Sequence, residues 1–242
     1  MFKDVIGDWP THERFILTSC DDKYFQDFFP RFYKTYKQHW QLPIHAHIID
    51  PSATSLQRLD KLDVTYTHCT TDKSVLRFPY SYETYCQAQR FILLGHNLLA
   101  NQSVIVADVD SYALRRPNQD QKQFAQSDMA FTRYCDFYKK KPKLMATFCN
   151  FHHSQKASAK KAAIKMQQII EDTDTIGVDQ LVIKQIFETL PYNNLKHEEW
   201  IRHFDVKTNK DLKAHNQCLI YHEKGTRGKL KPVETTWTDI GL

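Results

Sequence analysis

The sequence lacks several features that would assign it to a class at once. Only 6 of its 242 residues are glycine, and none of its six cysteines forms a CxxC pair. The longest apolar stretch, FILLGHNLLA at residues 91–100, is about half of the ~20 residues that a membrane span needs. These absences argue against a loop-rich or fibrous chain, a structural zinc site and a transmembrane protein.

Charge and targeting patterns exclude further classes. The net charge of +5 suits an anionic ligand, but there is no recognition-helix motif, zinc-finger spacing or long basic stripe, so we expect no nucleic acid partner. The opening stretch MFKDVIGDWPTHERF has no basic-then-apolar signal pattern. We therefore expect a cytoplasmic protein with free, mostly packed thiols, no transmembrane segment and at most peripheral contact with a membrane.

Apolar strands alternate with amphipathic helices in the first half of the chain. RFILTS after Glu13, PIHAHIID and DVTYTHC are predicted strands, as is the SVIVA run before the aspartates. Residues 23–40 and 81–101 have helical periodicity, and we expect Pro30 to kink or break the first of these helices. A short helix at residues 52–62 is expected to have Ser52 or Ser55 as its N-cap, and Ser81 is expected to cap the later one.

The second half continues this alternation with less regularity. We predict strands at 128–134 and 144–151, helices at 154–173 and 178–190, and short strands at 203–207 and 217–222. The pattern favours an α/β fold, with a mixed, mostly parallel central sheet flanked by helices in a single domain of residues 1–242. We divide it into a nucleotide-binding half, 1–117, and an acceptor- and metal-closing half, 118–242.

Two carboxylates, Asp108 and Asp110, follow directly after a short apolar strand. In open α/β sheets, ligands bind beyond the carboxyl ends of the strands, and burying a carboxylate unpaired is costly. A divalent cation would satisfy both side chains, because carboxylate oxygens are hard ligands. The alternative is that one aspartate caps a following helix while the other is solvated. The metal hypothesis fails if both side chains avoid any cleft, or if arginines of the same chain neutralise them.

Four segments carry a resemblance to a known family. VIVADVDSYALRRP, at residues 104–117, resembles the DxD segment of GT-A glycosyltransferases, in which a short helix follows the motif. YCQAQRF, VDQLVI and HEKGTRGKLKP resemble elements of the glycogenin and galactosyltransferase-like retaining group. The last segment departs from the family spacing, because position 228 is glycine and Lys229 comes one residue late. The resemblance extends over roughly residues 12–232 and implies a GT-A, Rossmann-like fold.

The resemblance also implies a function and a site. The chain would move a sugar from a nucleotide-diphosphate donor, a UDP-sugar by resemblance, to a glycan or glycoside acceptor, with retention as an extension. The imidazole among the expected metal ligands favours Mn²⁺ over Mg²⁺; these ligands are Asp108, Asp110 and His222. The expected donor contacts are Asp21, Arg90, Asp108, Asn150, Gly225 and Lys229. The expected catalytic residues near the sugar or acceptor are Asp128, Asp179 and Gln180.

Other interpretations stay open at this point. Arg90 taken singly fits a solvated helix residue, and His222 fits a satisfied residue at a strand end. A sugar-phosphate nucleotidyltransferase has a related fold but usually a glycine-rich segment after its first strand, where this chain has TSCDDKYF. The shifted Lys229 also leaves open the alternative that the chain is a catalytically inactive relative that binds a glycan.

Overall fold

The structure is a computed structural model of the chain. It describes residues 5–72, 81–119, 130–135, 142–173, 175, 177–188, 190, 193–196, 201–203, 220–222 and 235–242. For residues 81, 130–135, 142–143, 193–196, 201–203 and 220–222 the backbone alone is described.

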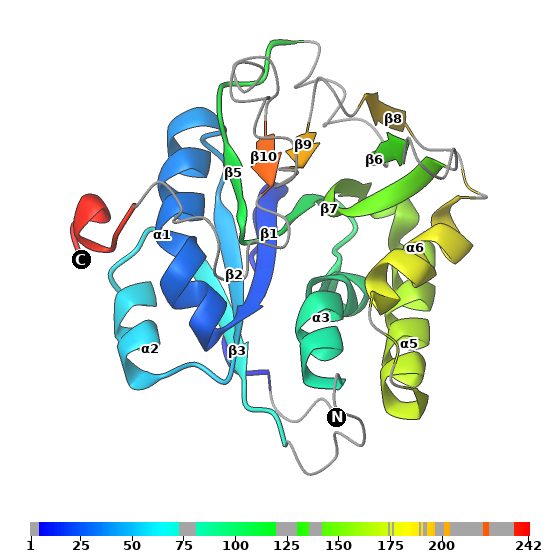
Figure 1. The fold of residues 1–242 in the computed structure, drawn as a ribbon, viewed down its shortest axis with the longest axis horizontal. Coiled ribbons are helices and arrows are strands. Elements are labelled where there is room, and N and C mark those ends of the chain that lie inside the picture. Colours follow the sequence, from blue (N-terminus) through cyan, green and yellow to red (C-terminus); the bar gives the residue numbers. More distant parts are fainter. Residues whose placement is uncertain are drawn as a thin grey trace.

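A seven-stranded sheet forms the centre of the described structure, in the order β3-β2-β1-β4-β7-β6-β8 (Figure 1). β3, β2, β1 and β4 run parallel, β7 is antiparallel to both β4 and β6, and β8 is parallel to β6. The prediction of a mixed, mostly parallel sheet is thus confirmed. The strands are β1 Arg14–Asp21, β2 Ile44–Ile49, β3 Thr65–Cys69, β4 Ser103–Ala107, β6 Ala130–Cys135, β7 Pro142–His152 and β8 Asn193–Lys196.

Helices cover both faces of the sheet, because alternate residues of its buried strands point to opposite sides. Phe15 and Leu17 of β1 pack among the residues of α3, α5 and α6, whereas Ile16 between them faces α1 and α2. Figure 1 shows these two groups of helices on either side of the sheet. Their bounds are α1 Asp22–His39, α2 Ala53–Leu59, α3 Ser81–Asn97, α5 Lys156–Asp172 and α6 Val178–Phe187, with 3₁₀ helices at His153–Gln155 and Thr238–Ile240.

The segment after the two aspartates is a strand and not the short helix that the resemblance implied. β5, Ser111–Ala113, joins a second sheet in the order β5-β10-β9, with β10 at Ile220–His222 and β9 at Ile201–His203. The β5–β10 pairing is antiparallel and links residues more than a hundred positions apart. Local sequence carries no signal for such a pairing, which explains why the helix prediction is wrong.

Several local predictions can be compared directly with the described residues. Ser52 caps α2, its hydroxyl accepting from the backbone N–H of Ser55, as expected. α1 runs without a break through Pro30, and α3 begins at Ser81. β9 ends at His203, so of the strand predicted at 203–207 only this residue lies within the described part. No helix in the described ranges is long and apolar enough to cross a membrane. The free thiols there are Cys20, Cys69, Cys86 and Cys149.

Candidate functional site

The turn after β4 places Asp108 and Asp110 at the carboxyl edge of the parallel strands. The backbone N–H of Asp108 donates to the carbonyl of Thr147 on β7, 2.9 Å away. The carbonyl of Asp108 accepts from both the N–H and the hydroxyl of Ser111, at 3.0 and 2.6 Å. Val109 is buried in the α1-side core, whereas both aspartates are partly exposed. The turn therefore presents two carboxylates at the edge where such sheets bind ligands.

Arg90 lies beneath this turn and joins it to α6. Its Nη2 lies 2.6 Å from Oδ1 of Asp108 and 3.1 Å from Oδ2 of Asp179. The arginine is 5% exposed, so the alternative of a solvated helix residue is wrong. Burial acts to lower the pKa of Arg90, but the charges of Asp108 and Asp179 outweigh burial and raise it. Arg90 therefore stays protonated and neutralises part of the charge of Asp108.

Among the described side chains, Arg90 interacts with more than one carboxylate. Asp110 also acts on the Arg90 guanidinium, although its effect is smaller than those of Asp108 and Asp179. The metal hypothesis fails if arginines of the same chain neutralise both aspartates. Arg90 does pair with Asp108, but Asp179 shares the same guanidinium.

The ligand chemistry at this turn fits a hard divalent cation, with one ligand outside the described side chains. Asp108 and Asp110 supply carboxylate oxygens, but no group of three His, Cys, Asp or Glu side chains suited to a metal gathers among the described ones. In the register of β10 with β5, His222 lies opposite Ser111, the residue that follows Asp110. The backbone of the third predicted ligand is thus brought beside the acidic turn.

Asp179 and Gln180, at the start of α6, are held by their neighbours. Asp179 is buried and paired with Arg90, as described above. With its amide oxygen and nitrogen assigned so that both find a partner, Gln180 donates to the carbonyl of Leu144 and accepts from the N–H of Ala146, both at 2.8 Å. These β7 residues lie next to an irregularity in the β6–β7 pairing, where the register shifts between Phe131 and Thr132. The Gln180 amide thus bonds to β7 backbone groups beside the turn of Asp108.

The other predicted residues lie in different places. Asp21 is at the carboxyl end of β1, where its Oδ1 accepts from the N–H of Tyr24 at 2.8 Å and caps α1. Asn150 is 1% exposed and lies opposite Ile105, with its side-chain oxygen accepting from Ser103 at 3.2 Å. Asn150 therefore faces the start of β4, away from the aspartates. Asp128, Gly225 and Lys229 lie outside the described residues, as does the side chain of His222.

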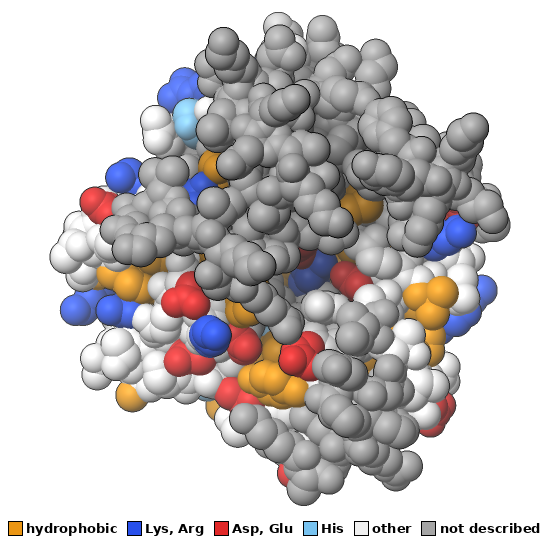
Figure 2. Space-filling model, viewed as in Figure 1, with side chains coloured by type: hydrophobic (Ala, Val, Ile, Leu, Met, Phe, Trp, Pro, Cys, Tyr) orange, Lys and Arg blue, Asp and Glu red, His pale blue; other side chains and the backbone are white. Residues whose placement is uncertain are grey.

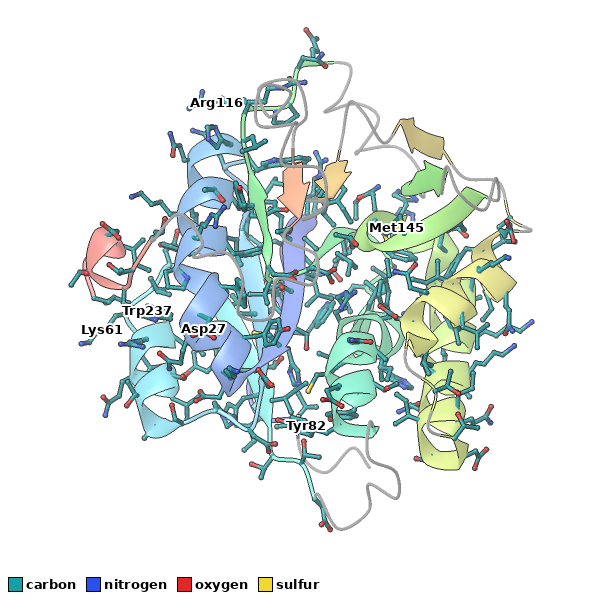
Figure 3. The ribbon with its side chains drawn as sticks, in the orientation of Figure 1. Asp27, Lys61, Tyr82, Arg116, Met145 and Trp237 are labelled. Carbon is teal, nitrogen blue, oxygen red and sulfur yellow. The ribbon has the colours of Figure 1, made fainter. Side chains whose placement is uncertain are left out.

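Sequence reasoning missed Asp50, which follows β2 as Asp21 ends β1. Its Oδ1 accepts from the N–H of Thr71 at 2.6 Å and its Oδ2 from the hydroxyl of Tyr82 at 3.0 Å. Figure 3 labels Tyr82 near the start of α3, and Figure 2 shows acidic side chains gathered between α1 and α3. The available signal was a carboxylate directly after a buried strand. Asp50 thus joins Thr71, two residues after β3, to Tyr82 of α3.

Comparison with known proteins identifies the fold. No protein-family model matches the sequence, and no curated protein does either. The solved structure of galactosyltransferase LgtC, in complex with donor and acceptor sugar analogues, has a TM-score of 0.63 and 12% identity, covering 94% of this chain and 92% of LgtC. The apo structure of the bifunctional glycosyltransferase WbbM has a TM-score of 0.59 and 14% identity, covering 90% of this chain and 47% of WbbM.

The chain has the GT-A, Rossmann-like fold of these structures. In this chain the acidic turn after β4 lies next to the carboxyl end of β1, at the edge where open α/β sheets bind ligands. The fold therefore agrees with the sequence resemblance. The turn at Asp108–Asp110 is the candidate active site.

Proposed function

We propose that this chain is a metal-dependent glycosyltransferase that moves a sugar from a nucleotide-diphosphate donor to a glycan or glycoside acceptor. A UDP-sugar is the proposed donor and Mn²⁺ the proposed metal, with Mg²⁺ as its substitute. Retention of the anomeric configuration extends the proposal. The observation that carries it is the acidic turn at Asp108–Asp110, set at the ligand edge of a GT-A fold with the backbone of His222 beside it.

The residues divide the work of such a reaction between them. Asp110, Asp108 and His222 would hold the cation, which when bound stabilises the negative charge that develops on the leaving diphosphate. Arg90 pairs with both Asp108 and Asp179, and its charge opposes the rise that burial causes in the pKa of Asp179. Asp21 is proposed to face the base and ribose, and Gly225 and Lys229 the diphosphate. Asp128, Asp179 and Gln180 are proposed on the side of the sugar and acceptor. The predicted donor contact of Asn150 stays a prediction, and its side-chain oxygen accepts from Ser103.

Calorimetry separates this proposal from its alternatives. We expect UDP to bind more tightly with Mn²⁺ than without it, and a panel of nucleotide sugars to yield nucleoside diphosphate when an acceptor glycan is added. Pyrophosphate release from a nucleoside triphosphate plus a sugar phosphate would instead identify a nucleotidyltransferase. Glycan binding without any nucleotide binding would identify an inactive relative. The anomeric configuration of the product, read by NMR, tests retention.

Asp110→Ala tests the metal site itself. The substitution removes a partly exposed carboxylate, so we expect it to abolish the effect of Mn²⁺ on nucleotide binding. The melting temperature of the metal-free protein should stay close to that of the wild type. Asp27→Ala, on the exposed face of α1, is the matched control and should leave both measurements unchanged. A large loss of apo stability in the Asp110 variant would show a structural carboxylate instead.

A further inference from the structure

Helix α1 holds the strand that follows the acidic turn through three different contacts. The hydroxyl of Tyr36 lies 3.1 Å from Oγ of Ser111, and both residues are buried. The N–H of Ala113 donates to the hydroxyl of Thr35 at 3.1 Å. The guanidinium of Arg31 lies 3.4 Å from the ring centre of Tyr112, which contributes a cation–π contact. Each residue of β5 is thus tied to one residue of α1.

The hydrogen bonds from Tyr36 to the acidic turn have a defined direction. The hydroxyl of Ser111 donates to the carbonyl of Asp108 at 2.6 Å, and a carbonyl oxygen can only accept. Since Ser111 has one hydroxyl proton, Tyr36 is the donor in the bond between the two hydroxyls. Burial raises the pKa of Tyr36, so its hydroxyl keeps that proton. The chain of bonds therefore runs from Tyr36 through Ser111 to the backbone of Asp108.

These contacts matter because the second sheet is small. β5 and β10 have three residues each, and short paired strands are marginally stable by themselves. The same pairing sets His222 opposite Ser111. Whatever fixes Ser111 thus fixes the turn of Asp108 and the backbone register of His222 together.

We propose that Tyr36 and Thr35 are positioning residues for the divalent cation, holding Asp108, Asp110 and the His222 strand in the geometry that binds it. This inference rests on the proposed function, because it assumes the cation site. Neither residue contacts the cation in this proposal. Both act through β5, as the hydrogen-bonding partners of metal ligands do elsewhere in proteins, where their loss weakens metal affinity by about 10- to 100-fold.

The test measures Mn²⁺ affinity, not turnover. Titration of free Mn²⁺, followed by electron paramagnetic resonance in the presence of saturating UDP, should give about 10-fold weaker binding for Tyr36→Phe. The ring of Tyr36 stays packed against Phe32, so the fold should persist. Tyr33→Phe is the matched control, one turn earlier on α1 and partly exposed, and it should bind Mn²⁺ like the wild type.

A second pair of variants, at Thr35, tests the inference independently in case Tyr36→Phe does not fold. Thr35→Val removes the acceptor for the Ala113 N–H at nearly constant volume and should also weaken Mn²⁺ binding. Thr35→Ser keeps a hydroxyl and should restore wild-type affinity. The double variant Ser111→Ala, Tyr36→Phe should bind Mn²⁺ with the same affinity as the weaker of the two single variants. Both changes break the same chain of hydrogen bonds, so their effects should not add.

The outcomes separate the two proposals. If the wild type shows no Mn²⁺-dependent UDP binding, both the proposed function and this inference are overturned. If the wild type binds Mn²⁺ and Asp110→Ala does not, but Tyr36→Phe and Thr35→Val bind like the wild type, the inference alone fails. Weakened binding in both variants, with recovery in Thr35→Ser, supports it.

Discussion

The indole N–H of Trp237 donates to the carbonyl of Gln26, 3.1 Å away, the carbonyl that Pro30 leaves without its helical donor. Proline has no N–H and cannot make the i to i−4 bond, which explains why Pro30 was expected to disturb α1. Trp237 also stacks near Phe25 and Phe29, and the guanidinium of Arg58 lies over its ring. Trp237, near the C-terminal end of the sequence, thus supplies the hydrogen bond that α1 lacks at Pro30.

This contact predicts a specific stability effect. Trp237→Phe keeps most of the ring but leaves the Gln26 carbonyl unpaired, so we expect a loss of about 1–3 kcal/mol in the free energy of unfolding. Adding Pro30→Ala supplies the missing N–H and should recover part of that loss. Urea unfolding of the two single variants and the double variant measures the coupling. Strict additivity of the two changes would contradict the assignment.

The buried ion pairs of Arg90 predict a larger effect. Arg90→Gln leaves two carboxylates without their cation, one of them 6% exposed, and should cost about 3–5 kcal/mol. Lys37→Met is the control, because Lys37 and Asp63 also lie 2.6 Å apart but the Asp63 side chain is 91% exposed. That exposed pair should contribute at most about 1 kcal/mol. Similar losses in both variants, measured by urea unfolding, would show that burial is not what matters at Arg90.

Two buried histidines on β2 predict a pH-dependent stability. Both ring nitrogens of His45 contact threonine hydroxyls, those of His47 contact Thr67 and Cys69, and both side chains are 0% exposed. Burial lowers the pKa of each histidine from 6.5 to about 3. Between these values the unfolded chain binds more protons, so stability is complete above pH 6.5 and falls as the pH decreases toward 3.

At pH 5 this loss should reach about 2 kcal/mol for each histidine. Urea unfolding between pH 5 and pH 8 measures it. His47→Gln should lower the overall stability but flatten the dependence on pH by about half. His96→Gln is the control, because His96 is exposed at the end of α3 and its loss should leave the slope unchanged. A flat wild-type profile would contradict the burial of these rings.

Gly95 lies where α3 crosses α5, and it predicts an effect of packing. A Cβ at this position would lie 2.4 Å from the carbonyl oxygen of Ala159 and 2.5 Å from the Cβ of Ala163. Gly95→Ala must push the helices apart and should cost about 1–3 kcal/mol in urea unfolding. Ala163→Gly removes one of these contacts and should restore part of the stability in the double variant. If the double variant regains no stability, the strain comes from the contact with Ala159 alone.

The sequence by itself determined the local elements and the position of the acidic turn. Apolar alternation and helical periodicity report which faces are buried, so they located β1 to β4, their helices and the Ser52 cap. The same logic placed Asp108 and Asp110 at the carboxyl end of a strand. It would also have found Asp50, had every carboxylate after a buried strand been considered.

Only the tertiary structure decided which distant segments meet. The antiparallel entry of β7, the pairing of β5 with β10 and the sharing of Arg90 between Asp108 and Asp179 all join residues far apart in the chain. Such contacts depend on how the whole sheet assembles. The sequence around a residue such as Arg90 does not reveal whether its side chain is solvated or buried. Burial patterns are local, but charge pairing and strand order are properties of the complete fold.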